Sequence, residues 1–245
     1  MTLWGIADTH LSLASDKPMD VFGPRWENYV GKLEQGWQSK VGPEDTILIL
    51  GDISWALKLE EAVADLTFLH SLPGKRKILL RGNHDFWWTT RTQVQGLIER
   101  EGLDTLELFQ NEALYIEEYK ALLVGTRGWK IPTDDSFSRE DEKVYKRELN
   151  RLDLSLQQGK SIKNKEDVKS ILGLMHYPPV TRDGKPSAFA EKMEGFGVKT
   201  CCYGHVHGSA GRQAFEGERK TCRYLKLSSD LVNFTPVRLL AEKQK

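Results

Sequence analysis

Apolar runs of strand length recur in the first third of the chain, and each ends abruptly in polar residues. They lie at residues 3–7, 46–50 and 77–81, and amphipathic stretches at 24–40 and 58–71 separate them. Continuous apolar runs are typical of buried parallel strands, whereas apolar positions three and four residues apart are typical of helices. The alternation predicts strands joined by right-handed helical crossovers, with their carboxyl ends on one edge of a sheet.

The pattern changes after a further predicted helix at residues 89–101. Three short apolar runs then predict a meander of strands at residues 105–108, 114–116 and 121–125. A strongly charged segment with loose helical spacing follows at residues 138–158. We expect it to form a helical cap over the site, within the wider segment 129–168.

The remainder of the chain returns to buried-strand patterns. Residues 170–175 and 199–203 predict two more buried strands, and a short helix is predicted between them at 188–196. The tail at 224–240 alternates loosely and predicts closing antiparallel strands. We expect a single domain over residues 1–245.

Composition and charge narrow the class of protein. Hydrophobic residues make up 39% and charged residues 29% of the 245, as in a soluble globular protein with a real core. Lys plus Arg equals Asp plus Glu at 35 each, so no broad charge footprint indicates nucleic acid or an anionic membrane. Cys201, Cys202 and Cys222 lack zinc-type spacing and are interpreted as buried thiols of a reducing compartment. With no leader-like or membrane-spanning pattern, we predict a cytoplasmic protein.

Potential metal ligands stand just past several predicted strands. Five of the six histidines lie there together with two aspartates and an asparagine: Asp8, His10, Asp52, Asn83, His84, His176, His205 and His207. The sixth histidine, His70, lies near a helix carboxyl end, where a partial positive charge is tolerated, and is interpreted as an ordinary residue. A lone loop histidine is usually solvated, but so many donors at strand ends predict metal binding.

The donor types indicate two divalent ions. Imidazole nitrogen and carboxylate oxygen without thiolate suit Mn, Fe, Zn or similar metals, and the set exceeds the needs of one four-coordinate site. Two ions about 3.5–4 Å apart can share a hydroxide, because coordination lowers the pKa of bound water towards about 7. Phosphate esters suit that geometry.

Five ordered motifs strengthen this hypothesis. Asp8-Thr9-His10, Gly51-Asp52, Gly82-Asn83-His84-Asp85, His176 and Gly204-His205-Val206-His207 resemble the motif set of calcineurin-like metallophosphoesterases. The resemblance implies an α/β fold, a four-layer αββα sandwich of two mixed β-sheets flanked by helices, with a two-metal site at the strand ends.

The resemblance also implies a role for each residue. Asp8, His10 and His207 would hold one ion, Asn83, His176 and His205 the other, and Asp52 would bridge them. A shared hydroxide would attack phosphorus in line, and protonated His84 would stabilise or protonate the departing alkoxide. Asp85 has two open interpretations, as an orienting partner of His84 or as a turn-capping residue.

Departures from relatives narrow the substrate. Protein phosphatases of this family carry GDxxDRG and GNHE, whereas this chain has Gly51-Asp52-Ile53-Ser54-Trp55 and Gly82-Asn83-His84-Asp85, which disfavours phosphoproteins. We predict hydrolysis of a small phosphomonoester or phosphodiester. A DNA or RNA nuclease and a non-catalytic protein-binding scaffold on the same fold remain alternatives, and nucleic acid is not the favoured partner.

Aromatic and cationic residues near the strand ends are candidate substrate contacts. Trp87 and Trp88 follow the third motif, and Arg127 and Tyr177 lie near later strand ends. They could grip a base, an ester group or phosphate oxygens. Packing or solvation is the competing interpretation for each.

Overall fold

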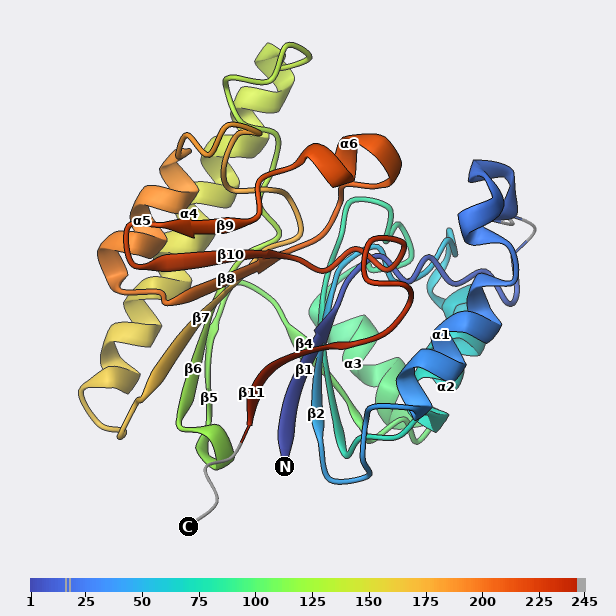
Figure 1. The fold of residues 1–245 in the computed structure, drawn as a ribbon. Coiled ribbons are helices and arrows are strands. Elements are labelled where there is room, and N and C mark those ends of the chain that lie inside the picture. The colour runs from blue at the N-terminus through green and yellow to red at the C-terminus, as the bar shows by residue number, and fades with distance from the viewer. Residues whose placement is uncertain (16, 18, 242–245) are drawn as a thin grey trace. The chain divides into compact units, whose positions relative to one another are not determined.

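The structure, a computed structural model, describes residues 1–15, 17 and 19–241. The chain divides into two compact units, residues 1–109 with 227–241 and residues 110–226. Each unit contains one mixed β-sheet flanked by helices, so the α/β class and the two mixed sheets are as predicted (Figure 1). A single domain over residues 1–245 stays a prediction.

The first unit is built on a five-stranded sheet in the order β11-β1-β2-β3-β4. Four strands are parallel, and β11 pairs antiparallel with β1 at one edge. The strands are β1 (Thr2–Ile6), β2 (Thr46–Leu50), β3 (Arg76–Leu80), β4 (Leu106–Phe109) and β11 (Val237–Ala241). The helices are α1 (Tyr29–Gln38), α2 (Val63–Ser71) and α3 (Arg91–Arg100), with short 3₁₀ turns at Met19–Phe22, Pro24–Trp26 and Leu59–Ala62.

Helices α1, α2 and α3 lie on one face of this sheet (Figure 1). Ile47 and Ile49, two residues apart on β2, point to that face and join one apolar cluster with Trp37 of α1 and Leu66 of α2. All five residues of β2 are buried, as a central parallel strand requires. The periodicity of the sequence therefore identified this core correctly.

Two sequence expectations for this unit are wrong. Residues 105–108 were expected in a meander, but β4 pairs in parallel with β3, because α3 forms another crossover before it. The helix expected at 24–40 is interrupted, since Asn28 adopts a left-handed conformation with φ of 49° and α1 begins only at Tyr29. Trp26 is nevertheless buried, as its spacing predicted.

Lys77 is a fully buried cation on β3. Its Nζ donates hydrogen bonds to the carbonyl oxygens of Gly74 at 2.8 Å and His70 at 3.1 Å. Burial lowers the pKa of Lys77 to about 8, although Asp104 opposes that shift. The lysine thus ties the end of α2 to the start of β3 at an electrostatic cost.

The second unit is built on a six-stranded sheet in the order β5-β6-β7-β8-β10-β9. Its four inner strands are parallel, and β5 and β9 are antiparallel edges. The strands are β5 (Ala113–Ile116), β6 (Ala121–Gly125), β7 (Ser170–Leu174), β8 (Thr200–Tyr203), β9 (Gly217–Arg219) and β10 (Cys222–Lys226). The helices are α4 (Arg139–Lys163), α5 (Ala188–Phe196) and α6 (Gly208–Gln213), with a 3₁₀ turn at Glu117–Tyr119. The tail was expected to form antiparallel strands. This is correct for β11, which pairs antiparallel with β1, whereas β10 is antiparallel to β9 but parallel to β8.

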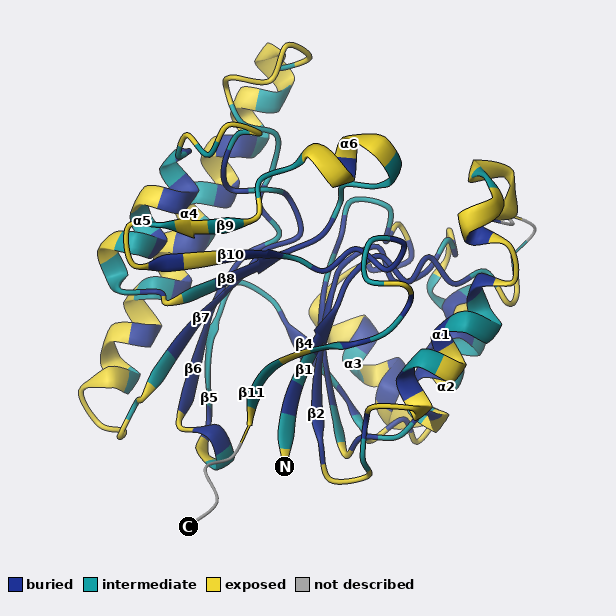
Figure 2. Ribbon diagram, viewed as in Figure 1, coloured by how far each residue is buried: buried dark blue, intermediate teal, exposed yellow. Residues whose placement is uncertain are grey.

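The charged segment forms α4, as predicted, and packs on this sheet with one face buried and the other exposed (Figure 2). Ser138 and Asp141 form a reciprocal capping box at its start. Gly159 allows a close approach to the sheet, because a Cβ there would lie 2.9 Å from Val124 Cγ1. The helix extends to Lys163, beyond the predicted end. A capping role for segment 129–168 stays a prediction.

Cys201, Cys202 and Cys222 are buried free thiols, as predicted. Burial raises the pKa of Cys202 to about 12 and that of Cys222 to about 11, so both are inert at neutral pH. Within the described part of the chain, no helix combines the length and apolarity needed to cross a bilayer.

Candidate functional site

The first unit gathers the predicted donors of its three strand ends. The loops after β1 and β2 continue the parallel pairing beyond the sheet, since Asp8 N donates to the Gly51 carbonyl and His10 N to the Asp52 carbonyl, each at 2.9 Å. Asp8, His10 and Asp52 are buried at 0%, 3% and 2% exposure. The extended ladder therefore brings two carboxylates and an imidazole side by side in a buried place, as predicted from the strand ends.

The backbone at these donors is strained. Asp8, His10 and Asp52 have φ angles of 58°, 45° and 48°, and His205 of the second unit has 71°. Residues other than glycine rarely adopt this left-handed region, and doing so costs about 1–3 kcal/mol. Strain of this kind clusters at functional sites, where the surrounding structure enforces it.

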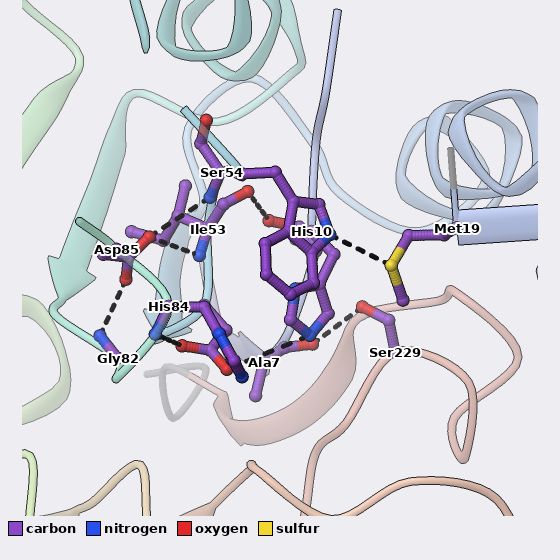
Figure 3. Close-up of polar contacts among 12 residues, drawn as sticks. Ala7, His10, Met19, Ile53, Ser54, Gly82, His84, Asp85 and Ser229 are labelled. Carbon is purple, nitrogen blue, oxygen red and sulfur yellow. Dashed lines mark hydrogen bonds and ion pairs between the residues drawn. The ribbon is translucent and has the colours of Figure 1, made fainter. Parts of the chain in front are cut away.

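The Gly82–Asp85 turn lies directly against Asp52. A Cβ on Gly82 would fall 2.1 Å from Asp52 N, so only glycine allows this approach. The backbone N–H of His84 donates to Asp52 Oδ1 at 2.7 Å, as drawn in Figure 3. Asn83 and His84 are half-buried. The turn thus holds Asn83 and His84 next to the carboxylate predicted to bridge two ions.

Asp85 is a structural clamp. Its fully buried carboxylate accepts hydrogen bonds from the backbone N–H groups of Ile53, Ser54 and Gly82 at 2.8, 3.2 and 2.7 Å (Figure 3). Desolvation, and then the charge of nearby Asp52, raise the pKa of Asp85 to about 6. These contacts support turn capping, one of the two interpretations of Asp85 that the sequence left open. The same carboxylate also holds the loop after β2 through the N–H groups of Ile53 and Ser54.

Trp55 lies against His10 and His84, the two strand-end histidines of the first unit. Its ring stacks on His10 at 4.9 Å between centroids with 20° between the planes, and lies 4.6 Å from His84. Its indole N–H points to Met19 Sδ at 3.0 Å. In the sequence, Trp55 is distinguished only as part of the departure from the phosphatase motif. That departure was the available signal, since helical or strand spacing gives none in a loop.

The second unit carries the three remaining histidines at the ends of β7 and β8. His176 is fully buried, and His205 and His207 are half-buried. The Gly204 N–H donates to the His176 carbonyl at 3.0 Å, which joins the two strand ends. The rings of His176 and His205 are 5.1 Å apart in an edge-on arrangement, and Tyr177 packs on His205 at 4.0 Å.

The structure corrects two of the predicted substrate contacts. Trp87 and Trp88 are 0% exposed and belong to the apolar core of the first unit, and Trp87 also donates its indole N–H to Asp85. Neither side chain has surface to offer a substrate. Phe86 is instead the exposed aromatic of this turn, at 54%, with its ring 6.1 Å from that of His84.

The two other predicted contacts lie in the second unit. Arg127 is largely buried, pairs with Glu148 at 3.3 Å and lies over the Trp129 ring at 4.7 Å. Tyr177 is nearly buried and lines a pocket described below. A substrate role for Arg127 and Tyr177 stays a prediction.

His70 of the first unit, interpreted as an ordinary residue, contacts Thr105 Oγ1 through Nδ1 at 3.0 Å.

Comparisons with known proteins agree with the motif order. The family model for calcineurin-like phosphoesterases matches residues 1–209, and the chain belongs to this family. A crystal structure of a protein of unknown function from Aquifex aeolicus is similar over 97% of this chain and 95% of its own, with 16% identity and a TM-score of 0.50. At that identity the likeness concerns the fold alone. No curated protein matches the chain.

The donor chemistry fits divalent metal ions. The first unit offers the carboxylates of Asp8 and Asp52, the Asn83 amide and one imidazole, and the second unit offers three imidazoles. The three thiols are buried with raised pKa values and do not compete as ligands. Nitrogen and oxygen donors of this kind suit Mn, Fe or Zn.

Proposed function

We propose that this protein hydrolyses a small phosphomonoester or phosphodiester with two divalent metal ions bound. The main support is the set of nitrogen and oxygen donors at the strand ends of a chain that belongs to the calcineurin-like phosphoesterase family. Four of these donors also have left-handed backbone. Asp8, His10 and His207 would hold one ion and Asn83, His176 and His205 the other, with Asp52 shared. Manganese is a suitable metal, and buried reduced thiols support a cytoplasmic location.

Two such ions, when bound, supply Lewis acidity and a hydroxide nucleophile at neutral pH. The chain itself supplies orientation and a proton donor. His84 is fixed through its backbone N–H to Asp52 and through its ring against Trp55. In its protonated form His84 would donate a proton to the oxygen of the leaving alkoxide. General acid catalysis of this kind typically raises the rate by about 10²–10⁴-fold. Its imidazole is therefore proposed as the catalytic acid.

Metal content and turnover together test this function. Protein loaded with Mn should contain about two ions per chain and should hydrolyse p-nitrophenyl phosphate or its bis-ester. Asp52→Asn should lose both metal and activity. His84→Ala should keep the metal but lose about 10²–10⁴-fold in kcat. The matched control His70→Ala should retain both.

Two results would count against the proposal. Full metal loading without turnover on a broad ester panel would remove the hydrolase hypothesis. Fewer than one ion per chain after reconstitution with Mn, Fe and Zn would favour the protein-binding scaffold.

A further inference from the structure

The second unit contains a pocket that no motif predicted. Its volume is about 620 Å³, within the range of about 300–1,000 Å³ typical of small-molecule sites. Trp129 and Phe215 contribute aromatic walls, and Tyr177 and His205 also line it. His205 is a proposed metal ligand, so the pocket begins where the phosphate of a substrate would lie.

The Trp129 wall is fixed in place. Its indole N–H donates to Asp141 Oδ1 at 2.8 Å, and Asp141 is itself held in the capping box of α4. The Arg127 guanidinium lies 4.7 Å from the Trp129 ring centroid, and the Tyr177 ring lies 5.0 Å away. A ring held by these contacts is preorganised to pack against a ligand.

The Phe215 wall is also fixed. Its carbonyl accepts a hydrogen bond from the Tyr203 hydroxyl, and its ring packs on Gly184. A Cβ at Gly184 would lie 2.7 Å from Phe215 Cε2, and the φ of +78° at this residue also favours glycine. The loop therefore approaches the ring closely enough to hold it.

The rest of the lining is mixed, and its apolar part consists of Ile131, Pro178, Val180, Val206, Ala210 and Ala214. Thr133, Asp134, Ser136, Thr181 and Arg182 contribute hydroxyl, carboxylate and guanidinium groups. Arg182 is exposed, and its side chain makes no ion pair or hydrogen bond with any other described residue. Ser136 already donates to Asp134, and Thr181 to Asp183. An acyl chain would offer no partner to the Arg182 guanidinium, whereas a ligand with an anionic group can pair with it.

We propose that this pocket binds the nucleoside part of a nucleotide substrate. The base packs between or against Trp129 and Phe215, the sugar hydroxyls meet the polar lining around Asp134, and the phosphate points to His205. This inference rests on the proposed function and specifies its substrate class. Aromatic stacking suits any base, so the pocket selects for nucleotides as a class.

Binding of AMP to the metal-free protein tests the proposal without turnover. Titration calorimetry should show saturable binding at one site, and tryptophan fluorescence should change with the same midpoint. Trp129→Ala and Phe215→Ala should each raise the Kd by about fivefold or more. Trp129→Phe should keep most of the affinity, which separates loss of the ring from loss of folding. Phe22→Ala, at a residue 65% exposed in the first unit, is the control and should leave the Kd unchanged.

The outcomes separate this inference from the proposed function. If the Mn-loaded protein hydrolyses methyl phosphate but AMP shows no binding up to millimolar concentrations, the nucleotide site is refuted and the hydrolase stands. If AMP binds as expected but no ester is hydrolysed with any metal, the nucleotide site stands and the hydrolase fails. Binding that is unchanged in both alanine variants, or tighter binding of octyl phosphate than of AMP, would also overturn the inference.

Discussion

Replacement of Asp85 should reveal how much of the first unit's site depends on one buried carboxylate. Its Oδ1 accepts hydrogen bonds from Ile53 N, Ser54 N and Trp87 Nε1, and its Oδ2 accepts one from Gly82 N. Asp85→Ala would leave four buried donors without an acceptor. At about 1–3 kcal/mol for each unpaired donor, the loss in unfolding free energy should be about 4 kcal/mol or more.

Asp85→Asn provides the matched comparison. An amide oxygen at the Oδ1 position would still accept three of the four bonds, while the amide nitrogen would face the Gly82 N–H. One bond is lost, but so is the cost of burying a charge, which is the larger cause of the raised pKa. We therefore expect Asp85→Asn to cost only about 1–2 kcal/mol.

Urea denaturation in EDTA, followed by tryptophan fluorescence, measures both losses without a contribution from metal. Asp135→Ala, at an exposed position, is the control and should lie within about 0.5 kcal/mol of wild type. If Asp85→Ala does not fold, amide exchange at Ile53, Ser54 and Gly82 in Asp85→Asn still tests the clamp, because only the Gly82 amide should lose protection. Equal costs for the two variants, or a cost below about 0.5 kcal/mol for alanine, would refute the reasoning.

Three further predictions concern the first unit. Gly82→Ala should lower the unfolding free energy by more than about 3 kcal/mol, because its Cβ would clash with the backbone of Asp52. Gly96→Ala, which has open space around it in α3, should raise the unfolding free energy by up to about 1 kcal/mol. Thermal unfolding of the two variants measures both changes. Between pH 8 and 10.5 the unfolded chain keeps a proton on Lys77 that the folded chain has released, so the unfolding free energy of wild type should rise with pH relative to that of Lys77→Met. Urea titrations at each pH should show this difference growing by about 3 kcal/mol over the range. A difference that does not change with pH would contradict the lowered pKa of Lys77. Trp55→Ala should lower kcat by about tenfold with little change in KM, because the His84 ring loses the aromatic ring it packs against. Trp55→Phe should retain most of the wild-type kcat. An equal loss of kcat in the two variants would exclude a positioning role for Trp55.

Much of the first unit could be predicted from its sequence because hydrophobic burial acts locally along each strand. Runs such as Ile47 to Leu50 are buried on both faces, so they read as central strands, and their polar ends must meet at one edge. Which strands pair with each other could not be predicted in the same way. The run at 105–108 has the same composition whether it continues a parallel sheet or begins a meander, and only the crossover through α3 decides between them.

The direction of side chains in tight turns is the second feature that could not be predicted from the sequence. Phe86, Trp87 and Trp88 are three consecutive aromatics, and the turn closed by Trp88 N to the Asp85 carbonyl exposes the first while burying the other two. Residue type cannot distinguish them, because each ring gains from burial. The same limit hid the contact of Trp55 with two imidazoles, which depends on how the β2 loop folds back beside β1.

At three strained positions the chain carries a nitrogen or oxygen donor where glycine would fit the backbone without strain. Asp8, His10 and Asp52 occupy left-handed backbone that glycine would adopt without penalty, and Gly51 beside them does so with φ of 86°. Glycine at all three would relieve about 1–3 kcal/mol at each position. It would supply no donor atom. The chain instead carries a nitrogen or oxygen donor at every one. The hydrogen bonds to the Asp85 carboxylate and the extended ladder after β1 and β2 hold that strained arrangement in place.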